Sequence, residues 1–252
     1  KKGVEKLLIS IPEKQRIIVK GLCKNFYPSY FESHSAELII NHCLIISKRK
    51  TDSVAKFFSK NNSFNTDSLM IYTKDRINVL GTIVGELDSH NINVLNARLY
   101  GTKNDYCLDH IIVSDQKGNP LKMDKDKIKY IELKIIKSLE KENLIPKVVN
   151  KKMPRYFQAL KKDTQIEISH DMVNRWTQLD IKTADRPGLL SSICSVFAKH
   201  NASIKKAGIS TYGERAEDRF CISSLEETPF LKERELDKLV SALKEALDVK
   251  TT

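Results

Sequence analysis

The chain has 252 residues, of which 40% are hydrophobic and 30% are charged, and its formal net charge is +11 at pH 7. No apolar run is long enough to span a bilayer, which argues against a membrane-spanning protein. The length favours two domains plus an extension. The chain begins Lys1-Lys2-Gly3-Val4, without an initiator methionine or a signal-peptide pattern, so we expect a segment from the middle of a longer protein.

The cysteines and the lysines indicate a compartment and limit the class of partner. Five cysteines are widely scattered and form no Cys-x-x-Cys pair, which is typical of buried thiols in a reducing cytoplasm. The 43 basic residues exceed the 32 acidic ones but are spread along the whole chain. We therefore interpret most of them as solvated helix faces and regard nucleic-acid binding as unlikely.

Residues 1–52 are predicted to be helical. Apolar side chains from Ala36 to Ile46 fall near one face of a helix that ends at the basic run 48–50, while Pro12 and Pro28 divide the region into short pieces. We expect this segment to be the end of an upstream helical domain without a core of its own.

An internal repeat follows, and it is the strongest signal in the sequence. Asp75-Arg76 and Asp185-Arg186 lie 110 residues apart, and apolar positions match around them in the preceding strand, the following helix and the next strand. His90-Asn91 matches His200-Asn201, and after a one-residue shift residues 109–113 match 218–222. Matching apolar positions indicate two copies of one packing unit.

Each copy is predicted to run strand, Asp-Arg turn, helix, strand, hairpin turn, strand, long loop, helix. This is most of a βαββαβ unit, so the fold class is α+β with two ferredoxin-like units. Strand candidates at 54–59 and 164–169 precede the two copies, and we expect each to pair with the first strand of its copy, which makes the units circularly permuted. The predicted divisions are 1–52, 53–145, a linker at 146–163, and 164–252.

The turn Thr183-Ala184-Asp185-Arg186-Pro187-Gly188-Leu189-Leu190 joins a strand to a helix. Proline suits the first turn of a helix, and glycine lets another group approach the backbone closely. The free N–H groups at the helix start can receive a carboxylate, while the Asp185 carboxylate can receive an ammonium. The alternative is that Asp185 only caps the helix.

These motifs resemble those of ACT domains, small βαββαβ modules that usually bind amino acids at the turn after the first strand. More specifically, residues 183–190 and 213–220 resemble the last ACT domain of the bifunctional PII uridylyltransferase/uridylyl-removing enzymes, a bacterial family of nitrogen regulation. Residues 106–120, Pro154-Arg155-Tyr156-Phe157 and, more faintly, Tyr30-Phe31 also resemble that family.

The resemblance implies a cytoplasmic, regulatory pair of ACT domains that senses glutamine and signals to catalytic domains outside this chain. Those domains would use Mg²⁺ and UTP and would act on the PII signalling protein, so we expect neither enzyme activity nor a cofactor here. His170-Asp171 is the one His-Asp pair, and it lacks the neighbours that a metal site needs. The two units are expected to pair within one chain or in a homodimer.

The expected ligand-binding residues come from both Asp-Arg turns. In the second copy Pro187 and Gly188 stand where the first has Ile77 and Asn78, so we predict that the second site binds better, although Asn78 can offer its own amide. His90 and His200 are expected to be surface or capping residues. The full predicted set is Asp185, Arg186, Pro187, Gly188 and Leu189 in the second copy, and Asp75, Arg76, Asn78 and Val79 in the first.

Two other functions remain open at this stage. RNA-recognition domains share the βαββαβ order but stack bases on aromatic residues of the central strands, where residues 111–113 and 220–222 are mainly aliphatic. The pair of units is otherwise a docking surface for another protein, with degenerate ligand sites.

Overall fold

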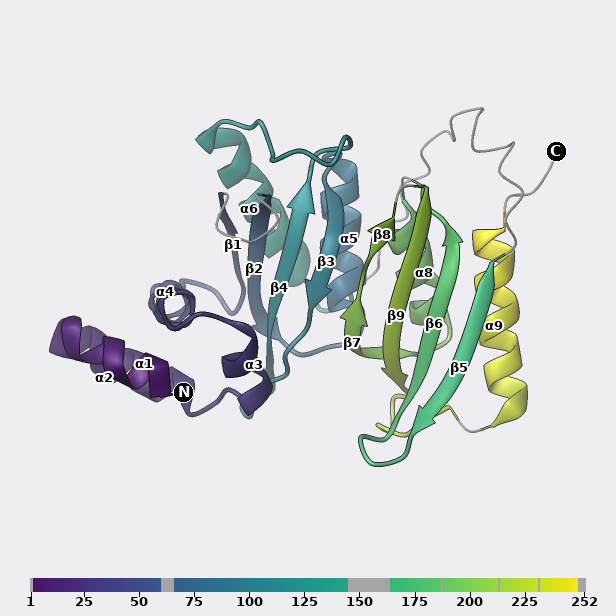
Figure 1. Ribbon diagram of the computed structural model, residues 1–252, viewed down its shortest axis with the longest axis horizontal. Helices are drawn as coiled ribbons and strands as arrows, with labels where there is room; N and C mark the ends of the chain where they lie inside the picture. Colours follow the sequence, from purple (N-terminus) through teal and green to yellow (C-terminus); the bar gives the residue numbers. More distant parts are fainter. Residues whose placement is uncertain are drawn as a thin grey trace.

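The computed structural model describes residues 2–59, 66–144, 164–186, 188–212, 214–230 and 232–248. A helical segment comes first, followed by two α+β units that lie next to each other (Figure 1). The predicted linker 146–163 and Pro187 lie outside the described residues. No helix of the described part is both long and apolar enough to cross a membrane.

The helical segment agrees with the predicted helical character of residues 1–52. Pro12 occupies the N-cap of α2 and Pro28 the first turn of α3, where a missing N–H does no harm. Ser35 caps α4 by accepting a hydrogen bond from the Leu38 N–H at 3.3 Å. The elements are α1 (Lys2–Leu7), the 3-10 turn η1 (Leu8–Ser10), α2 (Glu13–Cys23), α3 (Pro28–Ser33) and α4 (Ala36–Ser47).

The first unit is an antiparallel sheet of strand order β1-β2-β4-β3. The upstream strand β1 pairs with β2, as the permutation hypothesis requires. The unit consists of β1 (Val54–Phe58), β2 (Asp67–Lys74), α5 (Val79–Ser89), β3 (Asn93–Arg98), β4 (Tyr106–Ser114) and α6 (Lys125–Leu139).

The second unit repeats this order as β5-β6-β9-β7, with the two-residue β8 added beside β9. Here too the upstream strand pairs antiparallel with the first strand of the copy, which confirms the circular permutation. The elements are β5 (Gln165–Asp171), β6 (Trp176–Ala184), α8 (Leu189–Lys199), β7 (Ser203–Gly208), β8 (Thr211–Tyr212), β9 (Arg215–Ser223) and α9 (Glu233–Leu247).

The two units pack against each other within the one chain. Helices α5 and α8 contact each other, as do the edge strands β3 and β7, and the buried residues of both units form one continuous apolar cluster (Figure 1). The Asn96 amide of β3 donates to the Ile209 carbonyl of the second unit at 3.4 Å. The shared core places the two Asp-Arg turns beside the interface between the units.

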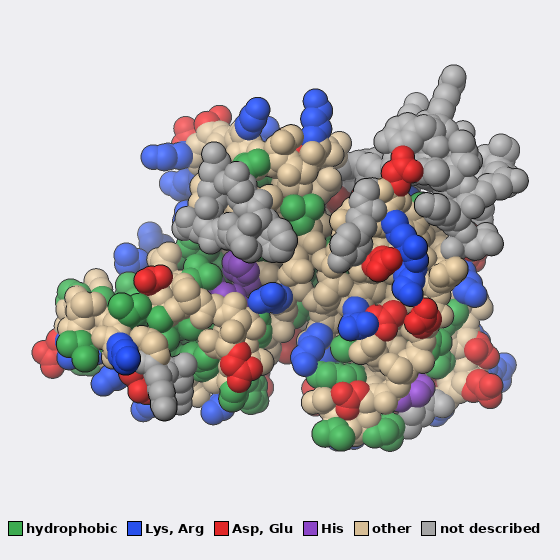
Figure 2. All heavy atoms as spheres, viewed as in Figure 1, with side chains coloured by type: hydrophobic (Ala, Val, Ile, Leu, Met, Phe, Trp, Pro, Cys, Tyr) green, Lys and Arg blue, Asp and Glu red, His purple; other side chains and the backbone are tan. Residues whose placement is uncertain are grey.

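The helical segment covers the remaining face of the first sheet only. A second apolar cluster joins residues of α2 and α4 to Met70, Tyr72 and Leu108, which face away from the shared core. Residues 67–73 of β2 are therefore buried on both faces, whereas the equivalent β6 alternates between buried and half-buried positions. Figure 2 shows basic and acidic side chains over the second unit, and its uncovered sheet face carries the ion pairs Arg219–Asp180, Lys182–Glu167 and Arg215–Glu217.

Candidate functional site

The two strand-to-helix turns have the same backbone conformation. The N-cap of α5 is Asn78 with φ 69°, and the N-cap of α8 is Gly188 with φ 79°. Glycine and asparagine are the residues that adopt this left-handed conformation most readily, which explains why asparagine can replace glycine here. Neither residue caps its helix with a side chain, so the first N–H groups of each helix are free of that partner.

The Asn78 side chain bonds within its own unit. Its backbone follows the same path as that of Gly188, and its side chain turns away from the helix start. The Asn78 amide donates to the Leu144 carbonyl at 2.9 Å and therefore serves the fold of its own unit. The first site therefore lacks the additional amide that the sequence allowed it, and the better binding of the second site stays a prediction.

Both turn aspartates are held by the hairpin of their own unit. The Asp75 N–H donates to the Asp105 carbonyl at 2.9 Å, and the Asp185 N–H donates to the Glu214 carbonyl at 3.0 Å. Burial raises the pKa of both carboxyl groups, and Lys205 opposes that rise at Asp75. Each aspartate is therefore fixed at the backbone, and its side chain lies at the edge of its cavity, exposed for Asp75 and half-buried for Asp185.

The arginines of both turns, predicted from the sequence to contact the ligand, bind the ends of helices. The Arg76 guanidinium donates to the carbonyls of Leu139 and Lys141 at the end of α6. The Arg186 guanidinium donates to the Ala246 carbonyl near the end of α9. A cation at a helix C-terminus satisfies free carbonyls and complements the helix dipole, so this geometry supports a capping role in preference to ligand contact.

A second buried carboxyl lies behind each turn. Asp109 of β4 and Asp218 of β9 are 2% and 3% exposed, and the positions two residues before and after each, on the same face of the strand, are apolar. Burial raises the pKa of Asp109 to about 8 and that of Asp218 to about 7, and in each case the turn aspartate adds to the rise. In the sequence these two residues stand out only as matching positions of the repeat, and the available signal was an acidic residue repeated on an otherwise apolar strand face.

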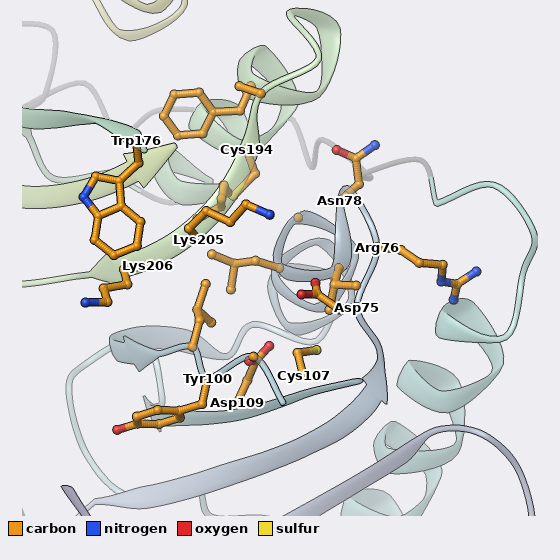
Figure 3. A pocket seen from close by; sticks show the side chains of 18 of the residues that line it. Asp75, Arg76, Asn78, Tyr100, Cys107, Asp109, Trp176, Cys194, Lys205 and Lys206 are labelled. Carbon is orange, nitrogen blue, oxygen red and sulfur yellow. The ribbon is translucent and has the colours of Figure 1, made fainter. Parts of the chain in front are cut away.

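A cavity of about 440 Å³ surrounds the first turn, and both units line it (Figure 3). From the first unit come Asp75, Asp109 and the start of α5, and from the second come Trp176 and Lys205. Figure 3 shows the Lys205 side chain extending toward the space in front of Asp75. Tyr27 and Ser29 of the helical segment also line this cavity, so it lies where three parts of the chain meet.

The second turn has an equivalent cavity of about 490 Å³, completed in turn by the first unit. Asp185, Gly188, Leu189 and Asp218 line it on one side. The α5 and β3 region of the first unit closes the other side. The two candidate sites are therefore related by the duplication, and each needs the other unit to be complete.

The two cavities differ in charge because the contributing units differ. At the repeat position of Lys205, which lines the first cavity, the second cavity has Leu95, and Asp88 lines the second where the repeat places Ala198. Lys205 also forms an ion pair with Glu227 at 3.3 Å. The first cavity thus offers both signs of charge, whereas the second is richer in carboxyl groups.

The remaining candidates have structural positions. His90 and His200 are the C-cap residues of α5 and α8, in line with the expectation of capping. His170 contacts the Thr177 hydroxyl at 3.1 Å, and Asp171 accepts from the Asn174 N–H in the β5–β6 turn. Within the described residues, no group of three or more His, Cys, Asp or Glu side chains is placed to hold a metal ion.

Comparison with known proteins finds relatives that carry the same name. A bifunctional uridylyltransferase/uridylyl-removing enzyme of Photobacterium profundum is 30% identical over 234 residues, which is 93% of this chain and 26% of that protein. Proteins of the same name from Vibrio cholerae and Psychrobacter arcticus are each 29% identical, over 86% and 84% of this chain. This chain matches a part of that enzyme.

The match covers only a fraction of those enzymes. The chain spans about a quarter of the length of the curated bifunctional uridylyltransferases that it matches. No protein-family profile matches it. A solved structure of an unknown protein from Galdieria sulphuraria is 16% identical and aligns over 77% of this chain, but with a TM-score of 0.24 it adds nothing to the assignment.

Proposed function

We propose that this chain is the amino-acid-sensing regulatory region of a bifunctional uridylyltransferase/uridylyl-removing enzyme, and that its two ferredoxin-like units are ACT domains. The proposal is supported by the relatives and by cavities at the two strand-to-helix turns. The ligand is a free amino acid, with glutamine as the candidate. The site would act by binding, with no chemical step of its own.

The chemistry of the first cavity suits a small zwitterion. The Asp75 carboxylate receives the ligand's ammonium, while the N–H groups at the start of α5 and the Lys205 ammonium receive its carboxylate. The helix dipole contributes roughly 0.3–1 kcal/mol and each charge-assisted hydrogen bond roughly 1.5–3 kcal/mol. After the entropy cost of binding, affinities between about micromolar and millimolar are expected.

The observation that carries this proposal is that the carboxyl group and the cation of one cavity come from different units. A ligand held by Asp75 and Lys205 at once links the first unit to the second. It therefore favours one arrangement of the two units over others, because a ligand shifts a conformational equilibrium through its differential affinity. This is the property that a regulatory module needs.

The activities of the longer enzyme belong to the same proposal. Uridylyl transfer to the PII signalling protein, with Mg²⁺ and UTP, and removal of the uridylyl group would take place on domains outside this chain. The helical segment, which both lines the first cavity and covers the first sheet, would carry the ligand signal toward them.

The proposal is tested by a thermal-shift screen of free amino acids at millimolar concentration. Glutamine is expected to raise the melting temperature, because a ligand that binds only the folded state stabilises it. Glutamate, asparagine and a non-amino-acid amide serve as controls of similar size. If no amino acid shifts the transition, the sensing function is wrong.

The chemistry of the sheet faces argues against RNA binding as the alternative. On the first sheet, Tyr72 stacks on Tyr106 with ring centroids 4.8 Å apart, but Tyr72 is buried beneath the helical segment. On the second sheet, the uncovered face of the central strands carries ion pairs where an RNA-recognition domain needs aromatic rings.

A further inference from the structure

Each sheet has one outer edge formed by the strand that precedes its repeat, β1 in the first unit and β5 in the second. An edge strand presents N–H and C=O groups that no neighbouring strand satisfies. Proteins protect such edges with charged side chains, bulges or a covering helix, because an open edge can pair with another chain. The two units differ in how far their outer edges are protected.

Helix α6 protects the edge of the first sheet. Phe57 of β1 lies opposite Leu69 of β2, and its N–H points away from the sheet, where it donates to the buried Glu132 carboxylate at 2.9 Å. The Lys56 ammonium lies 3.1 Å from the same carboxylate. Another strand could add to this edge only by displacing Glu132.

The equivalent protection is missing at the edge of the second sheet, as far as the described residues show. Ile168 of β5 lies opposite Leu179, the repeat partner of Leu69. Ile168 therefore holds the place of Phe57, and its N–H points outward. At the position where α6 has its carboxylate, the repeat gives α9 Val240, which has no acceptor to offer. Moreover, α6 packs along β1, whereas α9 contacts β5 far less.

Strand β5 is also regular and exposed. Its residues Gln165–Asp171 pair with β6 without a bulge and include no lysine, proline or glycine. Residues 167–170 are exposed, and the central Ile168 is 40% exposed. Figure 1 shows β5 on the side of the second unit that faces away from the first. The second sheet therefore ends in an open edge with an apolar residue at its centre.

We propose that this edge is an interface between two copies of the chain, in which β5 pairs antiparallel with β5 of the other copy about a twofold axis at Ile168. In this arrangement Glu167 lies opposite Ser169 of the other copy. Asp171 lies opposite Gln165, so no two acidic residues face each other. The pairing joins the two second sheets into one continuous sheet.

The charges of β5 select this register and favour a second copy as the partner. The next register in one direction places Glu167 opposite Glu167 of the other copy, and the next in the other direction places it opposite Asp171. Like charges directly opposite each other destabilise a strand pair. The self-complementary register is specific to pairing of β5 with itself, and an unrelated extended peptide would gain nothing from it.

This interface goes beyond the proposed function and does not depend on it. Among the described residues, those that line the two cavities include none of β5. Pairing through β5 therefore leaves both cavities and the contact between the two units of one chain as they are.

The test is analytical ultracentrifugation of the full chain over a range of concentrations. The wild type is expected to form dimers that dissociate on dilution, because a single strand pair is a small interface. Ile168→Pro should weaken the dimer about tenfold or more, because it removes the two hydrogen bonds that Ile168 exchanges across the axis. An edge strand tolerates proline where the N–H faces outward.

The variants Ser169→Lys and Ser169→Glu test the register. Lysine opposite Glu167 should strengthen the dimer and glutamate should weaken it, so that the two dissociation constants differ about tenfold. Net charge alone predicts the reverse order, because an added lysine increases the repulsion between chains that each carry +11. Leu133→Lys and Leu133→Glu, at an exposed position of α6, measure that net-charge effect by itself.

A wild type that stays monomeric at every concentration would overturn the proposal. A dimer that Ile168→Pro leaves unchanged would place the contact elsewhere and overturn it too, as would Ser169 variants that follow the same order as the Leu133 variants. Because Ser169 is exposed, its variants decide the matter even if the proline variant does not fold.

Discussion

At the scale of single residues, the duplication shows how two different side chains serve one backbone conformation. Asn78 and Gly188 both have positive φ, so the helix starts coincide although the sequences differ. The first copy adds a side-chain hydrogen bond to Leu144 that glycine cannot make. Asparagine at this position is therefore a structural choice of the first unit and is compatible with ligand binding there.

We predict that Asn78→Ala lowers the free energy of unfolding by about 1–2 kcal/mol more than Asn78→Gly does, because alanine in the left-handed region carries that cost. Gly188→Ala should lower the free energy of unfolding by a similar amount. Urea denaturation of the three variants measures this. Equal losses for the alanine and glycine variants at position 78 would mean that the hydrogen bond to Leu144, and not the backbone conformation, dominates.

The turn arginines give a second prediction at this scale. Arg76→Ala and Arg186→Ala should each lower the free energy of unfolding by about 1–3 kcal/mol, because each removes a charged donor from the carbonyls at the end of a helix. Urea denaturation combined with glutamine titration separates stability from binding. If glutamine binding is lost while the free energy of unfolding is unchanged, the arginines contact the ligand and do not cap the helices.

At the scale of elements, three histidines join the helical segment to the first sheet. His34 and His42 of the helical segment lie with ring centroids 5.0 and 6.0 Å from that of His110 on β4. The Tyr30 hydroxyl contacts His42 Nδ1 at 2.6 Å. Burial lowers the pKa of all three, and that of His110 falls to about 4.

Acid should therefore weaken the docking of the helical segment. A histidine with a depressed pKa in the folded state stabilises that state above its unfolded pKa of about 6.5, and this contribution is lost as the pH falls toward 4. For His110 alone the loss between pH 7 and pH 5 is about 2 kcal/mol. His110→Leu should show a smaller loss than the wild type in urea denaturation at the two pH values, and equal losses would refute the role of this cluster.

Elements also show what the sequence could predict. The repeated strands, helices and hairpins could be predicted from the spacing of apolar residues, because the apolar side chain at each repeated position packs within its own unit. The permutation followed from Ile166 and Ile168 alternating next to an otherwise open sheet edge, and β5 pairs there. Coverage of the first sheet by the helical segment was not predicted, because only the doubly buried β2 distinguishes it from the singly buried β6.

The candidate site was less predictable for the same reason. Asp75 and Asp185 could be found because the turn is local in sequence. Lys205 completes the first cavity from the other unit, and Asp109 enters it from the middle of a strand, so both depend on how distant segments pack. No short sequence motif shows that Lys205 and Asp109 lie at the first cavity. The charge difference between the two cavities also depends on how the two units pack together.

At the scale of the whole molecule, the two units use related surfaces to form one core. The contacts of α5 with α8 and of β3 with β7 join equivalent elements, so the pairing is close to twofold symmetric. A surface of this kind can be self-complementary. We predict that a fragment of residues 1–144 forms a homodimer through α5 and β3, as seen by analytical ultracentrifugation. A monomeric fragment that remains folded would show that the interface needs features of the second unit.

The same architecture makes the central claim directly measurable, because the two cavities can be disabled one at a time. Isothermal titration of glutamine into the wild type, Asp75→Ala and Asp185→Ala compares them. The sequence pattern favoured the second site, but the cation that Lys205 adds to the cavity of Asp75 leads us to expect the larger loss of affinity in Asp75→Ala, at least tenfold. If titration of glutamine into the wild type produces no heat, or if both variants bind it as the wild type does, the cavities between the units are not amino-acid sites.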